Sequence, residues 1–177
     1  NNAAASLTLS GANTYTGATT VNAGTLALGS GGNLAATAVA VNFPGTLAIA
    51  QTASSTTNAI TGSITLNAGA AFTMADNFAS TLSVTGASTL APATGASTAM
   101  TFDIVGAATD QLAIAGIATV GAAGAKIAIA PSTTAITTGS YTVITAASGL
   151  STNLSLANSF LPNADGLYTL SLATSTA

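Results

Sequence analysis

The sequence has no cysteine, histidine or tryptophan, and only 3% of its 177 residues are charged, against roughly 25% in an ordinary soluble domain. The five charged residues are Lys126 and four aspartates, Asp76, Asp103, Asp110 and Asp165. Without cysteine there is no disulfide or thiolate metal site, and without histidine the commonest general acid or base is missing. A single cation cannot neutralise a series of phosphates. We therefore expect no enzyme activity, no cofactor, no metal and no nucleic-acid partner.

Small side chains make up most of what is present. The chain has 42 alanines and 50 serines and threonines, but only 39 valines, isoleucines, leucines and phenylalanines together. The mean hydropathy of +0.63 therefore comes largely from alanine. This composition suits thin, closely stacked layers better than a thick globular core.

Apolar and polar residues alternate with a period of two along the whole chain, which is typical of β-strands. The short alternating runs are bounded by Gly, Asn, Ser or Pro, and Gly and Thr interrupt every alanine-rich stretch. We expect an all-β protein with almost no helix. The alternating runs are 7–9, 25–28, 46–49, 64–66, 82–84, 141–144, 154–156 and 168–172.

A short phrase recurs three times, as VNAGTLAL from Val21, VNFPGTLAI from Val41 and LNAGAAFTM from Leu66. Recurrence at 20 to 25 residues indicates a solenoid, in which each coil buries its apolar side against its neighbours. The Asn-Ala-Gly and Asn-Phe-Pro-Gly segments are expected at corners, because Asn and Gly tolerate left-handed backbone conformations. At about 22 residues per coil, the chain would make roughly eight coils. A β-sandwich remains the alternative fold, because the repeat is faint in the second half.

Residues 112–130 are nearly all apolar or small and were weighed as a membrane span. Lys126 lies within them, and a charge within a span costs about 2.5 to 3.5 kcal/mol. Glycines also recur, and the larger residues alternate. The segment is better explained as two strands joined by a Gly-rich turn, so we expect no membrane insertion.

The N-terminal segment LTLSGANTYTGATTVNAGTLAL, residues 7–28, resembles the autotransporter-associated β-strand repeat of secreted bacterial surface proteins. Ala18 stands where the family usually has a second glycine. The segment 101–124, followed by 137–146, resembles the region that often follows such repeats. The resemblance implies one domain over 1–177, a right-handed parallel β-helix with clearer repeats in 1–100 and a passenger-like region in 101–177. The motif residues are Gly11, Asn13, Tyr15, Gly17, Val21, Asn22, Gly24 and Leu26.

The few residues that could carry chemistry have simpler interpretations. Asp103 and Asp110 could form an acid pair, but turn capping is the expected role. A calcium site needs several convergent oxygens; Asp76-Asn77 and residues 163–166 contain suitable atoms but are also turn sequences. Lys126 is the only base available to activate a nucleophile.

The resemblance implies a secreted protein at the bacterial surface with a structural or adhesive role. We expect a self-assembling subunit of an extracellular filament, sheath or matrix, because the ends of a solenoid present unpaired strands and this chain has few charges to guard them. The alternative is a monomeric adhesin or passenger fragment that acts as a spacer. The expected partner is therefore a second copy, with glycans left open. The candidate inter-subunit strand contains Ala3, Ala5, Leu7 and Leu9.

Overall fold

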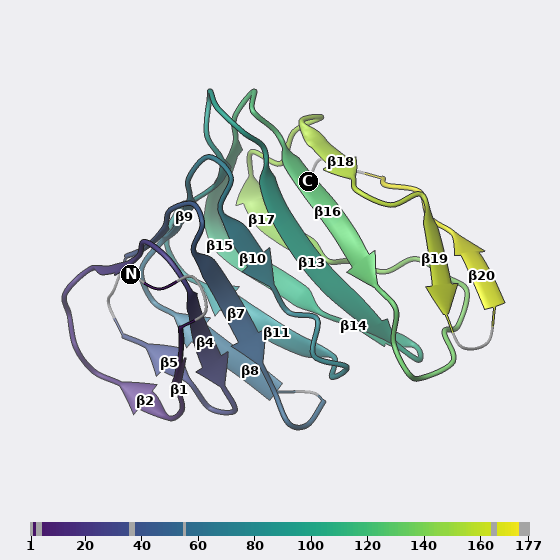
Figure 1. Ribbon diagram of the computed structural model, residues 1–177, viewed down its shortest axis with the longest axis horizontal. Coiled ribbons are helices and arrows are strands. Elements are labelled where there is room, and N and C mark those ends of the chain that lie inside the picture. The colour runs from purple at the N-terminus through teal and green to yellow at the C-terminus, as the bar shows by residue number, and fades with distance from the viewer. Residues whose placement is uncertain (1, 3–4, 36–37, 55, 164–165, 174–177) are drawn as a thin grey trace.

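The computed structural model describes residues 2, 5–35, 38–54, 56–163 and 166–173. Within these residues the secondary structure consists of strands and turns, with no helix. The chain winds as successive coils, and each coil adds one strand to each of up to three faces (Figure 1). Neighbouring strands along a face are parallel, as a solenoid requires and a sandwich of hairpins does not. The all-β parallel solenoid predicted from the sequence is confirmed.

Face A runs the full length of the solenoid and carries the clearest register. Its strands are β1 (Ser6–Leu9), β4 (Thr25–Gly29), β7 (Thr46–Ala50), β10 (Ala71–Thr73), β13 (Thr98–Val105), β16 (Ala125–Ala130) and β18 (Leu154–Leu156). In order along the face they pair β1-β4-β7-β10-β13-β16-β18.

Faces B and C complete each coil. Face B contains β2 (Ala12–Asn13), β5 (Asn33–Leu34), β8 (Thr56–Ile60), β11 (Ser80–Val84), β15 (Gln111–Val120) and β17 (Ile144–Ser148). Face C contains β3 (Thr19–Val21), β6 (Val39–Val41), β9 (Ile64–Leu66) and β12 (Ser88–Ala91). The long strand β15 joins the two faces, because its first half pairs with β11 and its second half with β12.

The coils lengthen along the chain, contrary to the expectation of eight equal coils. Ser6 of β1 pairs with Thr25, 19 residues later, whereas Lys126 of β16 pairs with Ser155, 29 residues later. Seven described strands in face A define six coil spacings, which at about 4.8 Å each give a length of about 29 Å. One cause of the lengthening is an inserted hairpin, in which β13 turns back as β14 (Ala108–Thr109).

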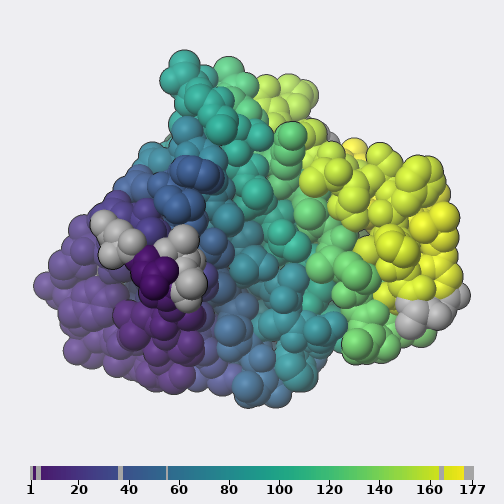
Figure 2. Space-filling view, viewed as in Figure 1, coloured from purple at the N-terminus to yellow at the C-terminus, as the bar shows by residue number. Residues whose placement is uncertain are grey.

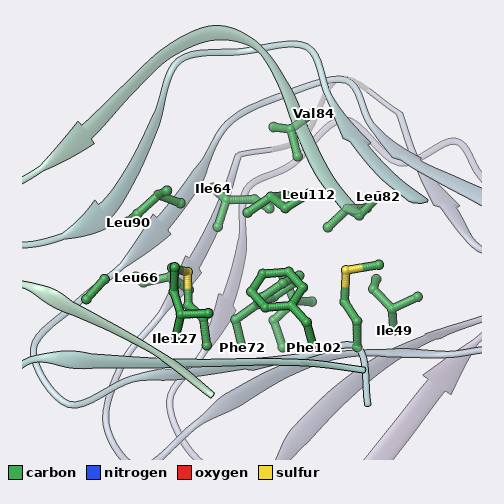
Figure 3. Close-up of a cluster of buried hydrophobic side chains, with 14 of the residues drawn as sticks. Ile49, Ile64, Leu66, Phe72, Leu82, Val84, Leu90, Phe102, Leu112 and Ile127 are labelled. Atoms are coloured by element: carbon green, nitrogen blue, oxygen red, sulfur yellow. The ribbon is translucent and has the colours of Figure 1, made fainter. Parts of the chain in front are cut away.

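The core is a set of apolar rows that run across the coils. One row in face A pairs, in order, Leu7, Leu26, Leu47, Phe72, Met100, Ile127 and Leu156. Figure 3 shows such side chains converging from different faces, with Phe72 and Phe102 opposite Leu82 and Leu112. The rings of Phe72 and Phe102 pack edge to face with centroids 5.9 Å apart. Alternation therefore places the large residues inside and the small residues outside, as the sequence predicts.

Several alternating runs form strands where predicted, and two do so only in part. Residues 112–130 form β15 and β16 joined by a turn, as predicted. Residues 141–144 do not form one strand, because the strand β17 begins only at Ile144. The Tyr141 hydroxyl donates to the carbonyls of Gly106 and Thr137, which holds this segment against the β13–β14 turn. Residues 168–172 are strand only at their start, in β20 (Gly166–Thr169), which pairs with β19 (Phe160–Asn163).

The two ends of the solenoid lie at opposite ends of the long axis (Figure 2). The first coil is at the N-terminal end, and the β19–β20 hairpin extends beyond β18 at the other end (Figure 1). No described helix is long and apolar enough to cross a membrane.

Candidate functional site

The repeat-motif residues lie in the first two coils and shape their turns. Gly11 and Gly24 have positive φ angles of 80° and 72°, which disfavour a side chain. At Gly24 a Cβ would also lie 2.4 Å from the carbonyl oxygen of Ala5. Asn13 donates to the carbonyls of Gly11 and Asn33, at 3.1 and 3.2 Å. These residues therefore fix the chain path rather than form a pocket.

The remaining motif residues divide between the core and the surface. Val21 and Leu26 are buried in the core cluster. Tyr15 is 42% exposed, and its hydroxyl hydrogen-bonds that of Thr19 at 2.9 Å. Gly17 lies in a bend with a negative φ and has open space at its Cβ position.

Asparagines at the corner between faces C and A form a ladder. The Asn42 side chain donates to the Oδ1 of Asn22 at 2.8 Å, and the Asn67 side chain donates to the Oδ1 of Asn42 at 2.6 Å. These are the three asparagines of the recurring phrase. The prediction that the phrase supplies corners is confirmed, and the ladder links three successive coils.

The outer side of the first coil pairs with no described strand. Strands β1, β2 and β3 each pair on one side only, with β4, β5 and β6. Leu7 is 59% exposed, although every later member of its row through Ile127 is buried. Ala5 is also exposed and Leu9 is half-buried; Ala3, the remaining residue of the predicted inter-subunit strand, lies outside the described residues.

The C-terminal end of the core contains a cavity of about 680 Å³. It lies between face A and the strand β17 of face B. Its aliphatic wall includes Ile127, Ile129, Val143, Ile144, Leu154 and Leu156. The packing seen in the middle coils is therefore incomplete at this end.

The segment after β20 partly covers this end of the solenoid. Leu170 donates a backbone hydrogen bond to the carbonyl of Ser159 at 2.9 Å, and Leu170 and Leu172 pack against the core. The expectation of two open ends is therefore wrong for the C-terminal end. The bare end is the N-terminal coil.

Three of the four aspartates gather where face A turns into face B, in a group that we call the polar corner: Gln51, Asn58, Asp76, Asp103 and Asp110. Asp76 accepts hydrogen bonds from the backbone nitrogens of Gln51 and Phe78, at 2.5 and 2.9 Å. One coil further on, Asp103 accepts from the backbone nitrogen of Asn77 at 2.6 Å. The aspartates thus cap the corner turns of successive coils.

Buried amides extend the polar corner toward the N-terminus. The Gln51 side chain donates to the Oδ1 of Asn58 at 2.5 Å. Asn58 donates to the carbonyls of Gly29 and Gly32, at 2.9 and 2.7 Å. Gln51, Asp76 and Asp103 follow one another at spacings of 25 and 27 residues, close to one coil, and this periodicity was the sequence signal for the cluster.

Asp103 and Asp110 are brought together by the β13–β14 hairpin. Asp110 is 0% exposed and Asp103 is 1% exposed. Asp110 accepts from the backbone nitrogens of Ser80 and Asp103, at 3.1 and 3.0 Å. The sequence predicted turn capping and left an acid pair as the alternative, and the structure contains both features.

Burial changes the acidity of the polar corner. Burial raises the pKa of Asp110 to about 8, and the neighbouring charge of Asp103 raises it further against the hydrogen bonds that lower it. Burial also raises the pKa of Asp103 and of Asp76, with backbone N–H donors partly opposing the shift in each.

The other candidate residues stand apart from the polar corner. Lys126 is exposed on β16. In the candidate calcium segment 163–166, Asn163 accepts from the backbone nitrogen of Ser132 at 3.1 Å, while Ala164 and Asp165 lie outside the described residues. Asp76 and Asn77 form the turn described above. Within the described part of the chain, no group of three or more acidic, histidine or cysteine residues is arranged to hold a metal ion.

The comparisons with known proteins identify one segment. Residues 4–28 match the family model of the passenger-associated-transport-repeat, which covers β1, β2, β3 and most of β4. The searches of curated proteins and of solved structures found no match. The resemblance of the N-terminal segment to an autotransporter passenger repeat is confirmed, and such a repeat implies a secreted or cell-surface protein.

Proposed function

We propose that the chain is a structural, non-enzymatic protein outside a bacterial cell that associates with copies of itself through its first coil. The passenger repeat at residues 4–28 supports the location. The observation that carries the association is the exposure of Leu7, at 59%, in a row that is otherwise built as core.

The first coil has the properties of an unfinished interface. Its three strands present N–H and C=O groups on a side where no described strand pairs with them. Such edges are normally guarded by charged residues or proline. Residues 2 and 5–21 contain neither, so a strand from another copy can approach without repulsion or desolvation of charge.

The C-terminal end offers a surface of matching chemistry. The cavity there is lined by aliphatic side chains from the end of the same core, and β17 pairs with β15 on one side only. Contact between the first coil of one copy and this end of the next is heterologous. Heterologous contacts that do not close a ring produce filaments, which is the assembly that the sequence predicts.

Sedimentation velocity over a concentration series tests this proposal. We expect native protein to form species larger than the monomer, and Leu7→Lys to remain monomeric, because a charge would be buried without a partner. Phe43→Lys is the matched control: Phe43 is 70% exposed but lies at a corner in the middle coils. Native protein that stays monomeric throughout the series would contradict self-association, and equal loss in both variants would contradict the assignment to the first coil.

A spacer that holds a binding region away from the cell is the second candidate. It is supported by the passenger repeat and by the covered C-terminal end, where Leu170 and Leu172 pack on the core. It predicts a monomer in which further coils of the same chain, rather than another copy, would occupy the outer side of β1. The concentration series separates the two candidates.

A further inference from the structure

One buried oxygen of the polar corner has no donor among the described residues. The Oδ1 of Asp103 is the only buried side-chain nitrogen or oxygen of this kind in that part of the chain. The other oxygen of Asp103 accepts from the backbone nitrogen of Asn77 at 2.6 Å. A buried acceptor without a donor costs about 1 to 3 kcal/mol, so this position calls for a proton donor.

The neighbouring carboxyl group is the nearest candidate to supply that proton. Asp103 and Asp110 are hydrogen-bonded to each other through their side chains, and a hydrogen bond between two carboxyl groups requires one proton. We propose that Asp103 and Asp110 share a single proton in the folded protein at neutral pH, so that the polar corner is a lock that acid tightens and alkali loosens.

The charges around the pair favour the shared proton. Asp76, in the turn before β11, is acidic and raises the pKa of its neighbour only by its own charge. The only basic residue, Lys126, is exposed on β16 and pairs with Ala99, four residues before Asp103 in the chain. Ser80 of β11 and Asn77 supply neutral donors, and the Tyr141 hydroxyl donates to the turn carbonyl of Gly106. Two adjacent buried negative charges would have no cation to balance them.

The shared proton makes stability depend on pH in an unusual direction. An unfolded aspartate has a pKa of about 3.9, whereas the folded pair holds its proton up to about 8. Between these limits the folded state binds one proton more than the unfolded state. The folding equilibrium constant should therefore fall about tenfold for each pH unit from about 4 to 8. It should be greatest at the acidic limit and level above the alkaline one.

Asparagine substitutions separate the shared proton from a purely structural role. In Asp103→Asn, the amide nitrogen can take the place of Oδ1 and donate to Asp110, while the amide oxygen accepts from Asn77. In Asp110→Asn, the amide nitrogen at one position would face the Asp103 backbone nitrogen, a donor that now contacts that carboxyl at 3.0 Å. We therefore expect Asp103→Asn to be the better tolerated variant.

Urea unfolding from pH 4 to 9 provides the test, with Ser80→Ala as the control. Ser80→Ala removes the hydroxyl donor to Asp110, at 3.2 Å, but leaves both carboxyl groups; it should lower stability at every pH and keep the slope. Asp103→Asn should reduce the slope to less than half of the native value. A native protein without the decline, or an Asp103→Asn slope above half, would overturn the proposal.

A titration of the native protein covers the case in which variants do not fold. Carbon-13 NMR of the carboxyl carbons is feasible because the chain has only four aspartates and no glutamate. We expect one titration near pH 8 that shifts the carbons of both Asp103 and Asp110. Two carbons that titrate separately below about pH 5 would overturn the shared proton. These measurements report on folding, so their failure is distinguishable from failure of the self-association proposal.

Discussion

The asparagine ladder allows the contribution of a single corner to be measured. Asn42 is the middle rung: it donates to Asn22 at 2.8 Å and accepts from Asn67 at 2.6 Å. Replacing Asn42 with alanine removes both hydrogen bonds, whereas replacing Asn22 or Asn67 removes one. At about 0.5 to 1.5 kcal/mol per hydrogen bond, Asn42→Ala should cost about 1 to 3 kcal/mol. Asn22→Ala should cost about 0.5 to 1 kcal/mol, because Asn22 is exposed and its bond competes with water.

Urea unfolding of the single and double variants would measure these costs. The slope of the free energy of unfolding against urea should stay constant, so that midpoints report stability alone. The double variant Asn22→Ala/Asn42→Ala should cost less than the two single changes summed, because both remove the same hydrogen bond. If Asn42→Ala costs no more than Asn22→Ala, or if the two changes are additive, the ladder does not couple the coils.

Three further predictions concern the core, the motif and assembly. Leu47→Ala, in a fully buried row position, should lower the free energy of unfolding by about 2 to 5 kcal/mol, whereas Leu7→Ala should change it by less than about 0.5 kcal/mol; equal effects would contradict the exposed first coil. Gly24→Ala should be much more destabilising than Gly17→Ala, because only Gly24 combines a positive φ with a 2.4 Å approach to backbone; thermal unfolding would compare them. Self-association should change little between low and about molar salt, because few charges are available for screening; sedimentation in both buffers would show this, and loss of the assembly at high salt would contradict it.

The all-β class and the corner positions could be predicted from the sequence because their signals are local. Alternation identified β1, β4, β7, β9 and β18, since these strands contain pairs of large apolar residues. The recurring asparagines fixed three corners. Local patterns were sufficient wherever one strand or turn determines its own conformation.

The coil count and the polar corner could not be predicted with the same reasoning. Strands such as β2 and β5 have two residues each, too few for a period to be visible. The lengthening of the coils depends on insertions such as the β13–β14 hairpin, whose position carries no apolar pattern. The burial of Asp103 and Asp110 depends on contacts between successive coils, so a chain-local interpretation as turn caps was incomplete.

Electron microscopy of the native protein at high concentration tests the central claim most directly. If copies associate through the first coil, filaments should form, and their diffraction should show a repeat of about 4.8 Å along the axis, because the strands would continue the spacing of the coils. The Leu7→Lys variant at the same concentration should form none. Dispersed single particles of native protein at every concentration would contradict the account.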